Sequence, residues 1–167
     1  MGGKSLGGRR VSNHDASQIA EAIRGEMEQK LGVSVHVAGS IRRLQPTCGD
    51  VDLVVVVSMA DLKQVMDTEQ WLRDRCGSAK NGKPKMQLLH DGVQVDITLV
   101  EPHQLGSAML HCTGSKLFNI KCRQAAIARG LQLSQHGLFE GDRLVASKTE
   151  REVLDAIGMA WVEPTDR

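Results

Sequence analysis

Aromatic residues are scarce in this 167-residue chain, which contains two Phe, two Trp and no Tyr. Stacking of nucleobases on aromatic side chains is therefore not an expected binding mode. Long apolar runs are also missing, since no stretch approaches the roughly 20 residues that span a bilayer. We expect no membrane partner, and we find no pattern typical of a secretory signal.

Cysteine is present without any of the spacings that give it a structural role. The four cysteines form neither a C-x-x-C pair nor a zinc-ligand pattern. This argues against a structural zinc site and a disulfide framework, and it favours a reducing compartment. We therefore expect an intracellular protein, with the cytoplasm as the default location.

The net charge is only +1, but the charges are distributed unevenly. Residues 44–114 contain six basic and nine acidic residues, whereas residues 115–151 contain seven basic and three acidic residues. A basic C-terminal region would suit contacts with phosphates. A solvated helix face explains the same pattern equally well.

The spacing of apolar residues predicts an α/β (α+β) protein with a mixed sheet flanked by helices. Asp91-Gly92 separates two alternating apolar segments and predicts a β-hairpin. In the helix expected over 59–75, Leu62, Val65 and Met66 are the expected apolar anchors. The other expected elements are helices over 15–31, 115–129 and 149–157, strands over 33–38, 51–57, 83–90 and 93–100, and a hairpin over 131–146.

The strongest chemical signal is a pair of carboxylates at the start of an apolar strand. Asp50 and Asp52 point to the same face because side chains alternate along a strand. Two such charges are tolerated best around a cation, and their hard oxygen atoms favour Mg²⁺ or Mn²⁺. A neighbouring strand would bring Asp96 to the pair, which then suits two metal ions. Each aspartate on its own is more often a strand-end cap or a turn residue.

A turn with the properties of an anion-binding site precedes the carboxylates. Gly39-Ser40 follows an alternating strand and precedes Ile41-Arg42-Arg43, which we expect to open a short helix. Gly39 lets the backbone approach a phosphate, Ser40 supplies a hydroxyl and Arg43 a bidentate guanidinium. We expect Arg42 to face solvent. The turn and the carboxylates together indicate a nucleotidyltransferase.

Later motifs narrow this class, because Thr113-Gly114-Ser115, Phe118-Asn119 and Arg123 follow in order. The combined pattern resembles the DNA polymerase X family, the group of DNA polymerase beta. The resemblance implies template-directed addition of dNMP from dNTP to a primer 3'-OH, with two Mg²⁺ ions that Mn²⁺ could replace, and short-gap filling in DNA repair. The implied partners of a monomeric enzyme are primer-template or gapped DNA and dNTP.

At 167 residues, the chain is long enough for only some of the domains that members of this family carry. No room exists before Gly39 for the N-terminal lyase domain and DNA clamps of many members, so we do not expect lyase activity. The chain resembles the minimal viral members, which implies a catalytic palm over residues 1–103 and a C-terminal nucleotide- and template-binding subdomain over 104–167. The same resemblance implies that a host cell is an alternative location to the cytoplasm.

The resemblance also implies a role for individual residues. Asp50 and Asp52 would bind both metal ions, and Asp96 would hold the catalytic one and favour deprotonation of the primer hydroxyl. Solvent exposure remains the alternative for Asn119 and Arg123. The implied nucleotide-binding residues are Gly39, Ser40, Arg43, Arg10, Thr113, Gly114, Ser115 and Asn119, and the implied DNA-binding residues are Arg123, Lys116, Lys83 and Lys85.

The sequence departs from the family pattern in three ways. His111-Cys112 takes the place of a common aromatic pair beneath the sugar, so selection against ribonucleotides could be relaxed. Gln94 stands where many members have an arginine near the primer terminus, so the primer contacts could differ. Lys116 stands where polymerase beta has an acidic residue near the base.

Two other functions share parts of this pattern. A template-independent nucleotidyltransferase acting on a small molecule, RNA or protein would share the Gly-Ser turn and the Asp-x-Asp pair, but the motifs after residue 110 speak against it. A noncatalytic DNA-binding protein would have little reason to retain all three carboxylates.

Overall fold

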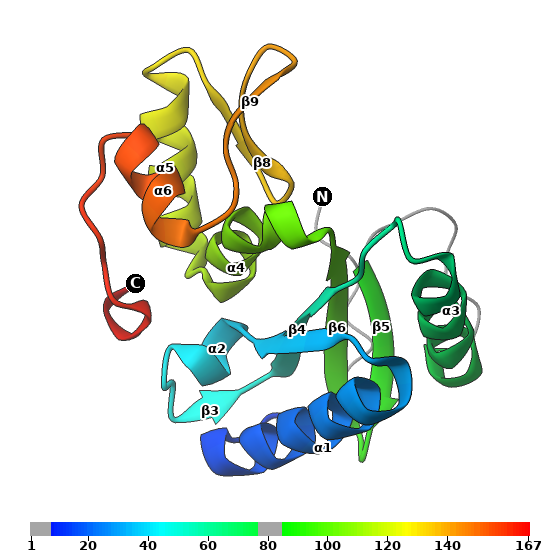
Figure 1. Ribbon diagram of the computed structural model, residues 1–167. Coiled ribbons are helices and arrows are strands. Elements are labelled where there is room, and N and C mark those ends of the chain that lie inside the picture. The colour runs from blue at the N-terminus through cyan, green and yellow to red at the C-terminus, as the bar shows by residue number, and fades with distance from the viewer. Residues whose placement is uncertain (1–7, 77–84) are drawn as a thin grey trace.

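A four-stranded mixed sheet lies at the centre of the N-terminal part of the computed structural model, which describes residues 8–76 and 85–167 (Figure 1). The strand order is β2–β4–β6–β5, in which β4 and β6 are parallel and the outer strands pair antiparallel. The central strands are rich in Val, Ile and Leu because both of their faces are covered. The strands are β2 (Ser34–Val37), β4 (Asp50–Val56), β5 (Lys85–His90) and β6 (Val93–Val100), and a separate pair joins β1 (Val11–Ser12) to β3 (Thr47–Cys48).

Different helices cover the two faces of this sheet. The helices in this part of the chain are α1 (Asn13–Leu31), α2 (Gly39–Arg42), α3 (Leu62–Cys76) and α4 (Leu105–Thr113). On one face, Val51 of β4 packs in a core that includes residues of α1 and α3. On the other face, Val54 packs against Ala108 of α4. Because side chains alternate along β4, Asp50 and Asp52 lie on the same face as Val54, the face that α4 covers.

Helix α1 confirms the helix predicted over 15–31. Its N-terminus is capped by Ser12, whose Oγ accepts the backbone N–H of Asp15 at 3.1 Å. It ends at Gly32, which has a left-handed backbone with φ of 63°. The side chains that it buries against the sheet are Ala16, Ala20, Ile23 and Met27.

Helix α3 begins three residues later than predicted, and two of its three predicted anchors are wrong. Asp61 caps the helix, because its Oδ1 accepts the backbone N–H of the third helical residue at 3.0 Å. With this start, Leu62 and Met66 are 72% and 67% exposed. Val65 is partly buried against the core, and Leu72 is fully buried two turns further on.

The chain beyond β6 builds a second hydrophobic core. This core includes Leu110 of α4 together with Phe118, Leu138 and Leu154. Helix α4 therefore packs against the central sheet on one side and belongs to the C-terminal core on the other. The boundary near residue 103 stays a prediction. The elements of this part are η1 (Pro102–Gln104), α5 (Lys116–Ile127), β7 (Gln132–Ser134), β8 (Gly137–Glu140), β9 (Arg143–Ala146), α6 (Glu150–Ala156) and η2 (Pro164–Asp166).

The structure confirms one of the two predicted hairpins and extends the other by a strand. Asp91 and Gly92 have φ of 49° and 74°, as the predicted hairpin between β5 and β6 requires. The hairpin predicted over 131–146 is a three-stranded antiparallel sheet, because β7 adds a further strand before β8. With these details corrected, the predicted fold class is confirmed.

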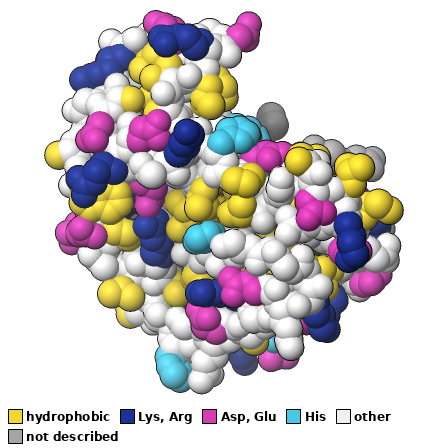
Figure 2. All heavy atoms as spheres, viewed as in Figure 1, with side chains coloured by type: hydrophobic (Ala, Val, Ile, Leu, Met, Phe, Trp, Pro, Cys, Tyr) yellow, Lys and Arg dark blue, Asp and Glu magenta, His cyan; other side chains and the backbone are white. Residues whose placement is uncertain are grey.

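The surface is mixed in character. Figure 2 shows basic, acidic and hydrophobic side chains interspersed on one face, with a notch between the C-terminal lobe at the upper left and the sheet region at the right. Within residues 8–76 and 85–167, no helix is both long enough and apolar enough to cross a membrane.

Candidate active site

The parallel strands β4 and β6 bring the three predicted carboxylates to one face of the sheet. Asp52 lies directly opposite Asp96 in the strand register, and Asp50 lies opposite Gln94. Adjacent strands are about 4.8 Å apart, so these side chains form a block of four neighbours. Asp96 is only 3% exposed, whereas Asp50 and Asp52 are partly exposed at the edge of the block.

The oxygen atoms of this block suit a hard divalent ion, but the side chains are not arranged as a finished metal cluster. No group of three or more His, Cys, Asp or Glu side chains in the described part of the chain could hold a metal ion as it stands. The Nε2 of Gln94 donates to Oδ1 of Asp96 at 2.8 Å. Three carboxylates on one face still match the ligand preference of Mg²⁺, so the residues fit the ion by chemistry and by strand register.

The predicted anion-binding turn contacts this block directly. Gly39, the first residue of α2, has φ of 61°, and a Cβ there would lie 2.1 Å from Oδ2 and 3.0 Å from Cβ of Asp52. The backbone N–H of Ala38 also donates to the carbonyl oxygen of Asp52 at 2.9 Å. Glycine is required here because the backbone is left-handed and Asp52 packs against it.

Ser40 is the second residue of the turn, and its hydroxyl is unusual. The Oγ atom is buried and has no hydrogen-bond partner among the described residues. Leaving a buried hydroxyl unpaired costs about 1–3 kcal/mol. Such an atom, next to a carboxylate block, suits a ligand that supplies the missing partner, such as a phosphate oxygen.

The two arginines of the turn contact the C-terminal part of the chain. Arg43 donates from Nη1 to the carbonyl oxygen of Thr113. The prediction that Arg42 faces solvent is wrong: Arg42 donates to Oγ1 of Thr113 at 2.6 Å and to both carboxylate oxygens of Glu150, at 3.0 and 2.6 Å. Its side chain is 25% exposed, because it reaches Thr113 at the end of α4 and Glu150 at the start of α6.

Glu150 is the centre of a buried ion-pair network. It also accepts from Nη1 of Arg167 at 2.6 Å, and the Arg167 side chain has no exposed surface. Burial alone would raise the pKa of Glu150, but the hydrogen bonds and charges of Arg42 and Arg167 outweigh it and hold that pKa below its ordinary value. Sequence reasoning missed this network, since 108 residues separate Arg42 from Glu150.

Thr113-Gly114-Ser115 forms the junction between α4 and α5. Thr113 is fully buried, and Ser115 caps α5 by accepting the backbone N–H of Phe118 at 3.4 Å. Gly114 has φ of 66°, and a Cβ there would lie 3.3 Å from Nη1 of Arg43. The junction therefore lies beside the anion-binding turn.

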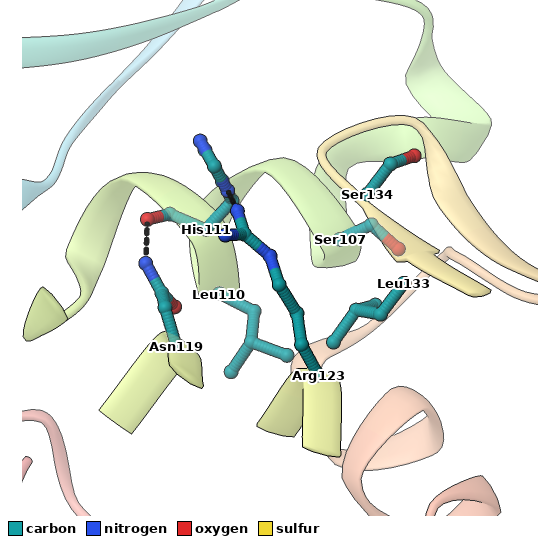
Figure 3. Close-up of a pocket in the computed structure, with 7 residues that line it drawn as sticks. All are labelled: Ser107, Leu110, His111, Asn119, Arg123, Leu133 and Ser134. Atoms are coloured by element: carbon teal, nitrogen blue, oxygen red, sulfur yellow. Dashed lines mark hydrogen bonds between the residues drawn. The ribbon is translucent and has the colours of Figure 1, made fainter. Parts of the chain in front are cut away.

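Asn119 and Arg123 project from α5 toward His111 on α4 (Figure 3). Asn119 donates from Nδ2 to the His111 carbonyl oxygen at 2.8 Å, and Nη2 of Arg123 lies 3.3 Å from His111 Nδ1. These residues line a pocket together with Ser107, Leu110, Leu133 and Ser134. The buried Ser107 hydroxyl has no hydrogen-bond partner within the described residues.

The remaining predicted contacts lie further from this centre. Arg10 donates to Oγ1 and the carbonyl oxygen of Thr47, both at 3.0 Å, and its Nη1 would be 3.3 Å from a Cβ on Gly49. It therefore lies beside the residue that precedes Asp50. Lys116 is exposed at the start of α5. Lys83 lies outside the described residues, and Lys85 begins β5 without a described side chain.

Paired carboxylates on parallel strands beside a Gly-Ser turn define the palm of a nucleotidyltransferase. The family model described as the DNA polymerase beta palm matches residues 10–97, and the one described as the DNA polymerase beta thumb matches residues 108–167. The chain therefore belongs to the DNA polymerase X family and contains the palm and the thumb of that family.

Individual relatives agree with this assignment. The repair DNA polymerase X of African swine fever virus is 28% identical over 167 residues, covering 96% of each chain. The DNA polymerase/3'-5' exonuclease PolX of Bacillus subtilis is 28% identical over 87% of this chain and 27% of its own. Leishmania infantum polymerase beta, solved as a ternary P/T complex, superposes with a TM-score of 0.79 at 25% identity, over 95% of this chain and 77% of that one.

Proposed function

We propose that this chain is a template-directed DNA polymerase that adds dNMP from dNTP to a primer 3'-OH and fills short gaps during DNA repair. The less specific part of this proposal, that the chain is a DNA repair polymerase, follows from its family and from relatives that are named for this activity. The observation that best supports the more specific part, nucleotide addition to a primer, is that Asp52 lies opposite Asp96 in the strand register and beside Gly39 of the turn.

In the proposed reaction the primer 3'-oxygen attacks the α-phosphorus of the dNTP, the new P–O bond forms, and pyrophosphate leaves. Asp50, Asp52 and Asp96 would hold two Mg²⁺ ions, or Mn²⁺ in their place, which when bound neutralise the charge that develops on the attacking and leaving oxygens. The primer hydroxyl gives up its proton as the new bond forms, and Asp96 would be the carboxylate that favours this deprotonation.

The turn and the helix junction would hold the nucleotide. The unpaired Ser40 hydroxyl offers a hydrogen bond to a phosphate oxygen. Arg43 has five N–H donors and uses Nη1 for Thr113, so it can bind a phosphate and the junction together. Gly114 would allow the sugar to approach the backbone, and Asn119 and Arg123 would contact the base and the template. DNA and dNTP are thus the proposed partners of an intracellular monomer.

Primer extension on gapped DNA tests the proposal. Wild-type protein with Mg²⁺ should add only the nucleotide that is complementary to the template, and Asp96→Asn should lower the rate by at least about 100-fold. Asp91→Asn is the matched control, since it removes a charge from the exposed turn of the same hairpin. Addition that ignores the template would favour the template-independent enzyme, and DNA binding without extension would favour a noncatalytic protein.

A further inference from the structure

Gln94 completes the block that the three carboxylates begin. It lies two residues before Asp96 on β6, so both side chains are on the same face, and it lies opposite Asp50 in the register. Gln94 is 4% exposed and Asp96 is 3% exposed. The 2.8 Å hydrogen bond from Gln94 Nε2 to Asp96 Oδ1 is therefore shielded from water.

A buried carboxylate requires a donor, and the type of donor matters in this block. A carboxylate at position 94 would add a fourth negative charge opposite Asp50 and could not donate. An arginine or lysine there would also donate, but it would add a positive charge beside Asp96. An amide donates a hydrogen bond without adding charge of either sign.

We propose that Gln94 is a positioning residue: by holding Oδ1 of Asp96 it keeps this carboxylate in one orientation toward a divalent metal ion and the acceptor hydroxyl. The inference rests on the proposed function, since that function gives Asp96 its role. It also gives Gln94, a departure from the family pattern, a specific task in this chain.

The N-terminal segment of the described chain offers a second way to displace Gln94. A Cβ on Gly8 would lie 2.7 Å from the backbone nitrogen of Gln94 and 3.0 Å from its Cβ. The adjacent Arg9 is held by a hydrogen bond from its N–H to the Gly92 carbonyl at 2.8 Å. A methyl group at Gly8 therefore forces either the start of β6 or the segment around Gly8 to shift, and the atoms nearest to it belong to Gln94.

The test compares Gln94→Met with Thr98→Val in the full-length protein. Methionine keeps the length of glutamine and removes its donor. Thr98 is a matched control, since it is 3% exposed on the same face of β6 and its hydroxyl bonds only weakly to Cys112, at 3.7 Å between Sγ and Oγ1. Gly8→Ala is the third variant.

Mn²⁺ binding to the protein alone, measured by the electron paramagnetic resonance of free Mn²⁺, is the readout that needs no polymerase activity. Loss of a residue that orients a metal ligand typically weakens metal affinity or activity by about 10–100-fold. We expect a loss in this range for Gln94→Met, a smaller loss for Gly8→Ala and a change below about twofold for Thr98→Val. In primer extension, Gln94→Met should lower kcat and leave the KM for dNTP within about threefold.

Two results would overturn the inference. One is wild-type Mn²⁺ affinity in Gln94→Met, together with a crystal structure that shows Asp96 in its original orientation. The other is an equal loss of Mn²⁺ affinity in Thr98→Val, which would reveal a general effect of disturbing β6. If the wild-type protein adds no nucleotide, the proposed function fails, but the Mn²⁺ affinity and the Asp96 orientation still decide the role of Gln94.

Discussion

The buried network of Glu150 with Arg42 and Arg167 links the anion-binding turn to α6 and the C-terminus, and Glu150→Gln should destabilise the protein strongly. Removing one partner of a buried ion pair costs about 3–5 kcal/mol, because the remaining charges lose their compensation. The Arg42 side chain is 25% exposed, so water can partly solvate it, whereas that of Arg167 has no exposed surface. We therefore expect the lower end of the range, about 3 kcal/mol.

Thermal unfolding followed by calorimetry measures this loss. For a protein of this size, each kcal/mol shifts Tm by about 2–4 °C, so Glu150→Gln should lower Tm by about 6–12 °C. The matched control is Glu140→Gln, which breaks the exposed Glu140–Arg143 ion pair, whose side chains are 56% and 71% exposed. That pair is worth less than about 1 kcal/mol. Equal decreases in Tm for the two variants would refute the reasoning.

The pH dependence of Tm in the same variant tests in which direction the stability contributed by Glu150 changes with pH. The folded state holds the pKa of Glu150 below its ordinary value of 4.5, so its ionised form is favoured by folding. The stability that Glu150 contributes should be fully present above pH 4.5 and should be lost as the pH falls through the lower, folded-state pKa. The Tm difference between wild type and Glu150→Gln should accordingly be constant near neutral pH and shrink in acid. A Tm difference that grows as the pH falls would contradict a lowered pKa of Glu150 in the folded protein.

Three further predictions concern the site and the cysteines. Gly39→Ala should lower kcat by about 100-fold, since its Cβ would displace Asp52 by roughly 1 Å; a fully active variant would show that this contact is not needed. Burial raises the pKa of Cys122 to about 11, so Cys122 should react with N-ethylmaleimide at pH 8 far more slowly than Cys112, and mass spectrometry showing equal labelling would contradict this. If His111-Cys112 relaxes sugar selection, ribonucleotides should be incorporated at rates near those of deoxynucleotides, and a strong preference for dNTP in primer extension would refute it.

Local patterns predicted the carboxylates well because strand alternation depends only on neighbouring residues. The same-face arrangement of Asp50 and Asp52 follows directly from their spacing, and the apolar run of β6 indicated a second buried strand. That Asp96 lies opposite Asp52 required the parallel pairing of β4 and β6, which a single sequence suggests but does not specify. Gln94 could have been found by the same alternation, since it precedes Asp96 by two residues.

Long-range contacts explain what sequence reasoning missed. Arg42 was expected in solvent because a basic residue after a turn is usually exposed, yet it reaches Glu150 across 108 residues. Nothing in the local pattern around Glu150, the first residue of α6, distinguishes it from a surface residue at a helix N-terminus. On α3, the cap at Asp61 sets which helix face is buried, so a small error in the start predicted the wrong anchors.

The most direct test of the central claim is a crystal structure of the protein with gapped DNA, a dideoxy-terminated primer, dNTP and Mn²⁺, analysed by anomalous scattering. The account predicts two Mn²⁺ peaks about 3.5–4 Å apart, coordinated by Asp50, Asp52 and Asp96 next to the dNTP phosphates. A bound dNTP with no Mn²⁺ within coordinating distance of these carboxylates would contradict it.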